Sequence, residues 1–211
     1  MGDDKVPAIG PRIRVERTRR EVTVRGLARE IGVSPSLISQ IETGKSQPSV
    51  STLYAITSAL GLPLEDLFDA GPADRQEAPT RAAGVDAGMR YLGTDRARGV
   101  GPHVSPAERE LLALDSGVTW QRLGQVPHHH VDFLLVTYAP GGSSSRSGEL
   151  MRHAGTEYGY LTSGELELTL GFDQHQLGPG DAVCFDSTTP HGYRNDGPEP
   201  AVGVWFVVEP G

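Results

Sequence analysis

The chain has 211 residues, of which 37% are hydrophobic, and its formal net charge at pH 7 is -8. This length allows one large hydrophobic core or two small ones. The sequence contains no apolar run of the ~20 residues that a membrane-spanning helix needs. Its start, MGDDKVPAIG, lacks the cationic and apolar blocks of a secretory signal. A single cysteine, Cys184, which we expect to be buried, excludes an internal disulfide framework and is typical of the reducing cytoplasm. We therefore expect a cytoplasmic protein.

Positive charge is concentrated near the N-terminus. Residues 5–45 contain nine Lys or Arg and four Glu, so this segment carries +5 (9 minus 4) although the whole chain is negative. The acidic excess lies mostly after residue 70. A basic segment joined to an acidic body predicts two domains with two kinds of partner.

Apolar spacing and capping residues predict an all-α unit of five short helices near the N-terminus. Thr23, Ser34 and Ser49 are candidate N-caps, Pro35 suits a first helical position, and Gly44 is expected to end the third helix. The five predicted helices span residues 12–20, 23–31, 34–44, 48–61 and 63–68.

A tight glycine-containing turn joins the second and third predicted helices, which is the helix-turn-helix arrangement. The second helix of such a pair enters the major groove of DNA and meets base edges with its N-terminal side chains. Gln40 is the best candidate for base readout, because an amide can both donate to and accept from an adenine edge. The other candidate DNA-binding residues have short polar, proline or lysine side chains that can reach bases or phosphates: Thr23, Ser34, Pro35, Ser36, Ser39, Lys45 and Ser46.

The segment LAREIGVSPSLISQIETGKSQPSVSTLYAITSALGLPLEDLF resembles the Xre or phage-repressor class of helix-turn-helix domains, over residues 9–68. The resemblance implies that the partner is an operator in double-stranded DNA. It also implies that Arg17 and Glu42 form a structural ion pair between the first helix and the end of the reading helix.

The composition changes after this unit. Residues 70–88 are rich in Ala, Gly and Pro without an apolar period, which is typical of a linker. Residues 89–117 have no clear pattern, and SPAERELLALDSG within them suits either a helical turn or a strand. We therefore predict a DNA-binding domain over 1–69, a linker over 70–90 and a second domain over 91–211.

From Gly117 onward, period-two alternation and turn signals predict β-strands. Six or more closely spaced strands argue for an antiparallel β-barrel or jelly roll, so the predicted fold class is a two-domain α + β protein. The β-rich runs cover residues 118–124, 131–140, 157–171, 175–185, 191–195 and 201–210.

Residues 118–208 resemble the cupin family, whose first motif has the form H-x-H-x3-4-E-x6-G. His153, Glu157 and Gly164 match this motif, whereas Met151 replaces its first histidine. In the family's second motif, His191 supplies the remaining histidine, and PGD (residues 179–181) and Asn195 also match.

The residue spacing suits a polar cluster inside the β-domain. Met151 and His153 are two residues apart and should share a face, while Glu157 and His191 can approach the same point. Two imidazoles and one carboxylate with open positions form the facial triad of mononuclear non-haem iron, and zinc accepts the same donors. Met151 removes a four-ligand site, because a thioether is a poor ligand for hard divalent metals.

Two alternatives stay open for this cluster. Either His153, Glu157 and His191 hold one divalent ion per chain, iron or zinc, or the three groups hydrogen-bond one another or an organic ligand in a metal-free pocket. In both cases we expect an effector pocket made of these residues with three further side chains. The predicted pocket residues are Met151, His153, Glu157, Tyr160, His191 and Tyr193.

The two resemblances together imply a transcription regulator whose cupin domain senses a small molecule. They imply a homodimer held together largely by the cupin domains, without a membrane partner. An alternative is an enzyme, because hydroxypropylphosphonate epoxidase has the same layout and holds iron with an H-A-G-x-E…H arrangement. The complete DNA-reading helix, with its cap and Gln40, favours the regulator over the enzyme.

Overall fold

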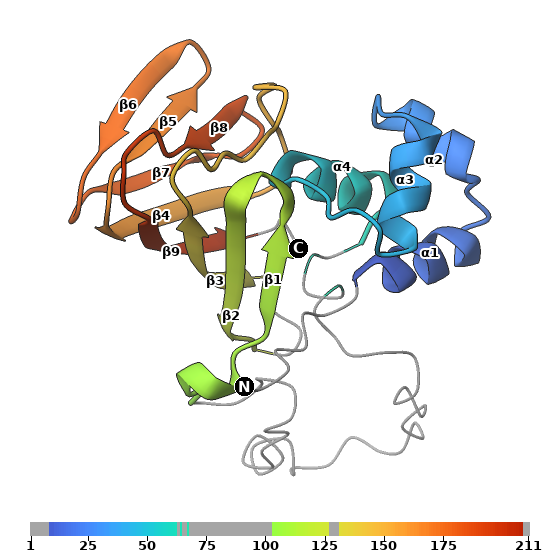
Figure 1. Ribbon diagram of the computed structural model, residues 1–211, viewed down its shortest axis with the longest axis horizontal. Coiled ribbons are helices and arrows are strands. Elements are labelled where there is room, and N and C mark those ends of the chain that lie inside the picture. The colour runs from blue at the N-terminus through green and yellow to red at the C-terminus, as the bar shows by residue number, and fades with distance from the viewer. Residues whose placement is uncertain (1–8, 63, 65–66, 68–102, 127–130, 209–211) are drawn as a thin grey trace, which may run out of the picture.

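The N-terminal part of the computed structural model is a bundle of short helices (Figure 1). The structure describes residues 9–62, 64, 67, 103–126 and 131–208. The predicted linker and most of the predicted fifth helix lie outside these residues. The helices are α1 (Ile9–Arg19), α2 (Val24–Glu30), α3 (Pro35–Glu42) and α4 (Val50–Leu60).

Local capping sets where α2, α3 and α4 begin, as predicted. The side chains of Thr23, Ser34 and Ser49 each accept a hydrogen bond from a backbone N–H in the first turn of α2, α3 and α4. Pro35 lies at the start of α3, where its missing N–H has no consequence. Gly32 has a φ of 74° in the turn between α2 and α3, a left-handed conformation that glycine adopts without strain.

The helices share one apolar core. Ile13, Leu27, Ile38 and Leu53 are fully buried, each from a different helix. Helices α1 and α3 approach closely at Gly10, where an added Cβ would lie 2.0 Å from the carbonyl oxygen of Ile41. This close packing predicts that the helices move as one body.

Residues 105–117, for which the sequence suggested either a helical turn or a strand, contain both. Residues of SPAERELLALDSG form a 3-10 turn, η4 (Pro106–Glu108), then strand β1 (Leu111–Leu114) and a second turn, η5 (Asp115–Gly117). The remaining strands are β2 (Val118–Gly124), β3 (Val131–Tyr138), β4 (Thr156–Ser163), β5 (Leu166–Leu170), β6 (Asp173–Leu177), β7 (Ala182–Asp186), β8 (His191–Arg194) and β9 (Ala201–Val208).

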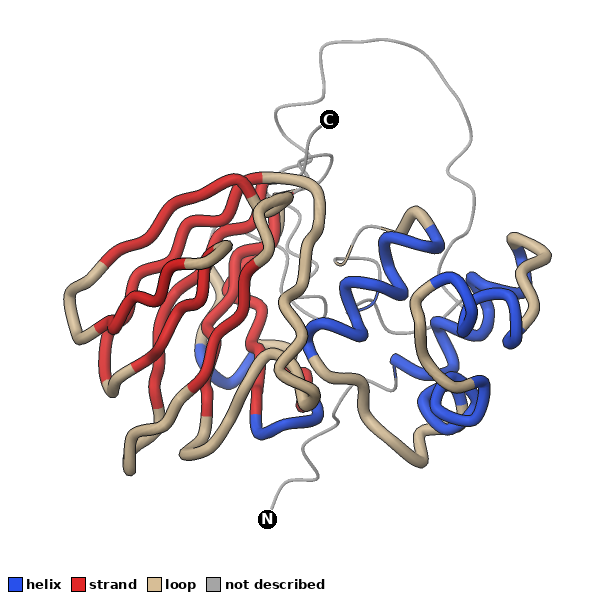
Figure 2. The backbone as a smooth tube through the Cα atoms, turned by 90° about the horizontal axis from the view of Figure 1, so that it is seen from above, coloured by secondary structure: helices blue, strands red, loops and turns tan. Residues whose placement is uncertain are grey.

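The described strands form two antiparallel sheets (Figures 1 and 2). The larger sheet has the order β1-β2-β3-β9-β4-β7 and the smaller has the order β6-β5-β8. The expected antiparallel β-domain is confirmed, but the described strands do not form one closed barrel, because no strand ladder joins the two sheets. Apolar side chains such as Leu134 and Leu168 are buried between them.

The two sheets, with the apolar side chains between them, are called the sandwich. A large indole lies within this sandwich. Trp205 of β9 fits beside the neighbouring strands because Gly159 and Gly203 carry no side chain there. A Cβ would lie 2.8 Å from the Trp205 ring at Gly159 and 2.3 Å from it at Gly203. The two glycines therefore make room for the Trp205 ring, which forms one wall of the interior of the sandwich.

The outward face of the larger sheet is apolar. Tyr158, Tyr160 and Phe206 are 47%, 50% and 40% exposed, and the strand register places Phe206 between Phe133 and Tyr158. Cys184 lies opposite Tyr158 and is exposed, so the expectation of a buried cysteine is wrong. The reason is that Cys184 stands on the edge strand β7, at an outward position of the alternation. In the part of the chain that the structure describes, no helix has the length and apolarity to cross a membrane.

Candidate functional sites

The N-cap of α3 and the exposed face of this helix form a polar surface. Ser34, Pro35, Ser36, Ser39 and Gln40 are all exposed. Polar side chains at the start of the second helix of a helix-turn-helix pair are placed to meet base edges. This surface of α3 therefore has the composition and exposure that a DNA-reading surface needs.

The flanks of this surface hold the remaining predicted contacts. Thr23 at the start of α2 and Lys45 after α3 are exposed, while Ser46 is half-buried. The exposed Arg25 and Arg29 of α2 add positive charge nearby in the chain. Such flanking groups are suited to phosphates rather than bases.

An ion pair fixes the end of α3 against α1. Arg17 donates from Nε to Glu42 Oε1 at 2.5 Å and from a terminal nitrogen to Glu42 Oε2 at 3.0 Å. Its other terminal nitrogen donates to the carbonyl of Val22 at 2.7 Å. The hydrogen bond to Glu42 raises the pKa of Arg17. This bidentate pair orients α3 against α1.

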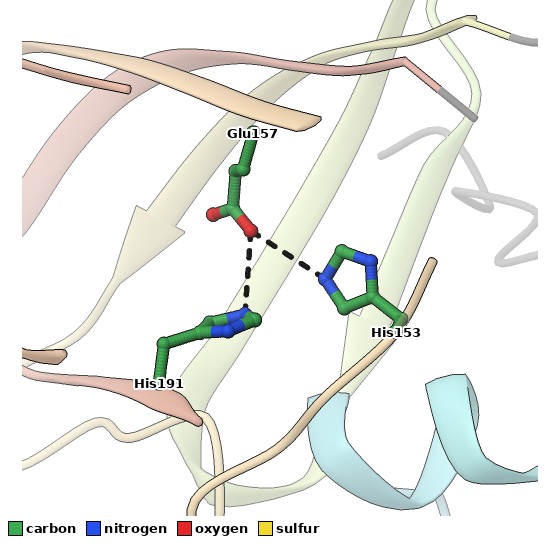
Figure 3. Close-up of side chains that lie close together, drawn as sticks. All are labelled: His153, Glu157 and His191. Carbon is green, nitrogen blue, oxygen red and sulfur yellow. Dashed lines mark ion pairs between the residues drawn. The ribbon is translucent and has the colours of Figure 1, made fainter. Parts of the chain in front are cut away.

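Three polar side chains from different segments meet inside the sandwich (Figure 3). Glu157 comes from β4 and His191 from β8, while His153 lies on the segment before β4. Met151 pairs with His191 through two backbone hydrogen bonds, which brings the His153 segment beside β8. The exposed fractions of His153, Glu157 and His191 are 7%, 3% and 0%.

Both imidazoles direct Nε2 at the carboxylate. His191 Nε2 lies 3.3 Å from Glu157 Oε2, and His153 Nε2 lies 3.5 Å from the same oxygen. The opposite nitrogens contact backbone carbonyls: His191 Nδ1 lies 2.9 Å from Thr189 O, and His153 Nδ1 lies 3.2 Å from Ala154 O. A carbonyl oxygen only accepts, so each Nδ1 carries the proton, and a neutral imidazole then has its Nε2 lone pair toward Glu157.

The cluster of His153, Glu157 and His191 requires positive charge between its three side chains. Both Nε2 atoms are buried without a hydrogen-bond partner among the described residues. Burial raises the pKa of Glu157, but protonated imidazoles that donate from Nε2 outweigh burial and bring this pKa to about 2, so the carboxylate is ionised beside them. Protonated imidazoles or a cation between the three groups would match this negative charge. The donor atoms all lie within 4.8 Å of one another, so the cluster could hold a metal ion.

A second layer of hydrogen bonds orients the carboxylate. Tyr193 donates from its hydroxyl to Glu157 Oε1 at 2.8 Å, and Trp205 Nε1 donates to the Tyr193 oxygen at 3.2 Å. Burial, and then the nearby Glu157 charge, raises the pKa of Tyr193 well above its ordinary value. The hydroxyl therefore keeps its proton and leaves Glu157 Oε2 to the imidazoles.

Helix α4 contributes a wall that sequence reasoning missed. The ring of Tyr54 stacks on the imidazole of His153, with centroids 4.0 Å apart and an angle of 5° between planes. Tyr54 also meets Trp120 edge-on at 5.8 Å. The sequence did contain a signal for this contact. Leu53 and Ile56 of α4 fill the helical core. Because Tyr54 lies on another face of α4, its large ring needs a packing partner outside that core.

The structure brings five of the six predicted pocket residues together. Met151, Glu157 and Tyr193 line one cavity, and His153 and His191 contact Glu157 beside it. Tyr160 does not join them and is corrected: it lies three positions after Glu157 on β4, so alternation sends it to the exposed outer face.

Comparisons with known proteins cover both parts of the chain. A helix-turn-helix model matches residues 13–67, and a cupin domain model matches residues 134–207. The transcriptional regulator PuuR of Escherichia coli K12 is 26% identical over 197 residues, which is 92% of this chain and 91% of PuuR. The regulator SutR of the same organism is 22% identical over 181 residues, 86% of this chain and 83% of SutR.

A solved structure of a Vibrio cholerae transcriptional regulator is also similar. It has a TM-score of 0.63 and 20% sequence identity, and the match covers 97% of each chain. The fold is therefore shared along both the helical part and the sandwich.

Proposed function

Because the chain is a helix-turn-helix transcriptional regulator with a C-terminal cupin domain, we propose that α3 reads an operator in double-stranded DNA under the control of a small-molecule effector. The effector binds in the cupin sandwich at Met151, His153, Glu157, His191 and Tyr193. Control requires that the effector has different affinities for the DNA-competent and DNA-incompetent arrangements.

The observation that carries the DNA proposal is the exposed polar end of α3, held in place by the Arg17–Glu42 pair. Gln40 reads a base edge, and Lys45 contacts a phosphate. A gel-shift with the duplex from upstream of the protein's own gene tests this. We expect specific binding that weakens steeply as salt rises, because phosphate contacts release counterions. Equal affinity for this duplex and a scrambled one would overturn the proposal.

For the cluster in the sandwich we propose one divalent ion per chain, iron or zinc, held by His153, Glu157 and His191. The unpartnered Nε2 atoms and the ionised carboxylate support this assignment. When bound, the ion supplies the positive charge that these donors face. Met151 lies in the same cavity as a neutral wall.

An iron-dependent oxygenase is a second candidate function. The donor set of two histidines and one glutamate favours it, because that set leaves coordination positions open. The two functions separate by experiment. Iron-dependent oxygen consumption with a candidate substrate, together with the absence of specific DNA binding, would establish the enzyme.

We also propose a homodimer formed by the outward face of the larger sheet. The outward residues of β3, β4 and β9 in this face include no charged side chain. An apolar sheet face of this kind suits association with a second copy, and helix-turn-helix domains generally read two half-sites about 34 Å apart as dimers.

Sedimentation of Phe206→Arg tests the proposed dimer surface. We expect a monomer, because a guanidinium at the centre of an apolar interface would be desolvated without a partner. Phe172→Arg is the matched control, since Phe172 is fully exposed in the turn between β5 and β6, where an arginine meets only water. A dimeric Phe206→Arg variant would exclude this face.

A further inference from the structure

Helix α4 belongs to the DNA-reading unit and also contacts the sandwich. Besides the stack of Tyr54 on His153, the Ser51 amide donates to Ser144 O at 2.9 Å. The Asp115 amide donates to Pro48 O, just before α4, at 2.8 Å. Figure 1 shows α4 between the other helices and the strands. Aromatic and backbone interactions thus join α4 to the sandwich.

The cavity is nearly filled while α4 is in place. It measures about 20 Å³ and is lined from α4 by Val50 and Tyr54, which leaves room for about one water molecule or ion. Tyr54 is only 5% exposed. The cavity volume is too small for an organic molecule, and the Tyr54 ring forms part of the cavity wall.

Tyr54 belongs to a helix that is packed firmly into the helical unit. Leu53, Ile56 and Leu60 of α4 are buried in the helical core. A packed core transmits a displacement of one helix to its neighbours. Displacing α4 from the sandwich therefore displaces α3 with it.

We propose that Tyr54 is a residue of the effector site and that α4 is its lid: an organic effector enters by displacing Tyr54 from His153, and this undocks the DNA-reading unit from the sandwich. The inference rests on the proposed function of the sandwich as a sensor. It assigns to the docked form the higher affinity for an operator with two half-sites. Docking fixes α3 of each chain relative to its own sandwich. In a dimer joined through the sandwiches, the two α3 helices are then also fixed relative to each other. Binding to two half-sites therefore does not have to restrict the free movement of the two helical units, which would cost conformational entropy.

The substitution Tyr54→Ala imitates the displaced ring without any effector. The probe is a duplex with two half-sites, selected from random sequences by binding to the wild-type protein, and a second duplex that retains one half-site. We expect about 10-fold weaker binding of Tyr54→Ala to the two-site duplex, because preorganisation is lost. Affinity for the one-site duplex should stay within about twofold of wild type, because α3 itself is unchanged.

Two control variants accompany this measurement. Tyr54→Phe keeps the stacked ring and should bind both duplexes as wild type does. Ser58→Ala changes an exposed position of α4 and should have no effect. Loss of binding to both duplexes by Tyr54→Ala would indicate damage to the helical unit and overturn the proposal, as would unchanged binding to the two-site duplex.

Hydrogen exchange tests the undocking without DNA. Ser51 lies in the first turn of α4, where backbone N–H groups have no partner within the helix, and Ser144 O supplies its acceptor. In Tyr54→Ala we expect exchange of the Ser51 amide to rise at least about 10-fold, while the amides of α2 and α3 keep their protection. Unchanged exchange at Ser51 would overturn the inference even if the protein binds DNA. Failure of the wild-type protein to bind DNA, with faster exchange at Ser51, would instead overturn the proposed function.

Discussion

The polar end of α3 and the cluster in the sandwich use polar side chains under opposite conditions. Ser36, Ser39 and Gln40 are exposed, so water satisfies them until DNA replaces it. His153 and Glu157 are almost completely buried, so protein atoms or a cation must satisfy them. A change on α3 should therefore alter recognition with little effect on stability, whereas a change in the cluster should alter metal binding, pH dependence and stability together.

The largest effect on stability is expected from the buried Arg17–Glu42 ion pair, which holds the end of α3 against α1. Glu42→Ala leaves Arg17 without its bidentate partner, and both side chains are mostly buried. We expect the free energy of unfolding to fall by about 3 kcal/mol, measured by urea denaturation. Arg194→Ala is the matched control, because the Arg194–Asp196 pair is more than half exposed and should contribute less than about 1 kcal/mol. Equal losses in the two variants would contradict this difference.

The pH dependence of stability sharpens the comparison. The pKa of Glu157 is about 2 in the folded chain, against an ordinary value of 4.5. A lowered carboxyl pKa stabilises the folded state above the ordinary value, and this stability is lost as pH falls toward 2. The full contribution is about 3 kcal/mol, of which about 2 kcal/mol is lost between pH 5 and pH 3.

Glu157→Gln, which cannot ionise, should lack this loss when unfolding by urea is compared at the two pH values. Glu165→Gln replaces an exposed carboxylate before β5 and is the control. A Glu157→Gln variant with the wild-type slope between pH 5 and pH 3 would argue against an ionised Glu157 in the folded protein.

Metal binding separates the cluster from histidines elsewhere. His191→Ala removes one of the three donors, so we expect at least about 100-fold weaker binding of zinc or cobalt, after loading and dialysis, by elemental analysis. His175→Ala is the control, since His175 is exposed on β6. Retention of about one ion per chain by His191→Ala would place the metal elsewhere.

The smallest effect is expected on the reading surface. Gln40→Ala should weaken binding to the operator by about 10-fold, because one amide contact to a base edge is lost, with the unfolding midpoint nearly unchanged. Lys45→Ala should instead weaken binding to all duplexes similarly and reduce the salt dependence of binding by about one charge. Titrations of the operator and a scrambled duplex at several salt concentrations distinguish the two variants.

The sequence predicts best what local interactions decide. Thr23, Ser34 and Ser49 cap the helices of their own neighbourhoods, so their roles follow from a few adjacent residues. His153 and Glu157 could be grouped by spacing and by family resemblance. Tyr160 was misplaced although its distance of three residues from Glu157 already implies opposite faces of a strand.

Contacts between distant segments were beyond the sequence. The stack of Tyr54 on His153 depends on how the helical unit docks on the sandwich, and no periodicity in either segment encodes that docking. The two separate sheets were likewise not evident, because alternation defines the faces of strands but not whether edge strands pair.

The positions of the two tryptophans have a practical consequence. Trp120 contacts Tyr54 and Trp205 contacts Tyr193, so every indole of the chain lines the same cavity. Tryptophan fluorescence from the unlabelled protein therefore originates entirely at this site. Trp205→Phe would leave Trp120 as the sole emitter, beside the ring that α4 contributes, so that compounds could be screened as effectors by the shift in its emission alone.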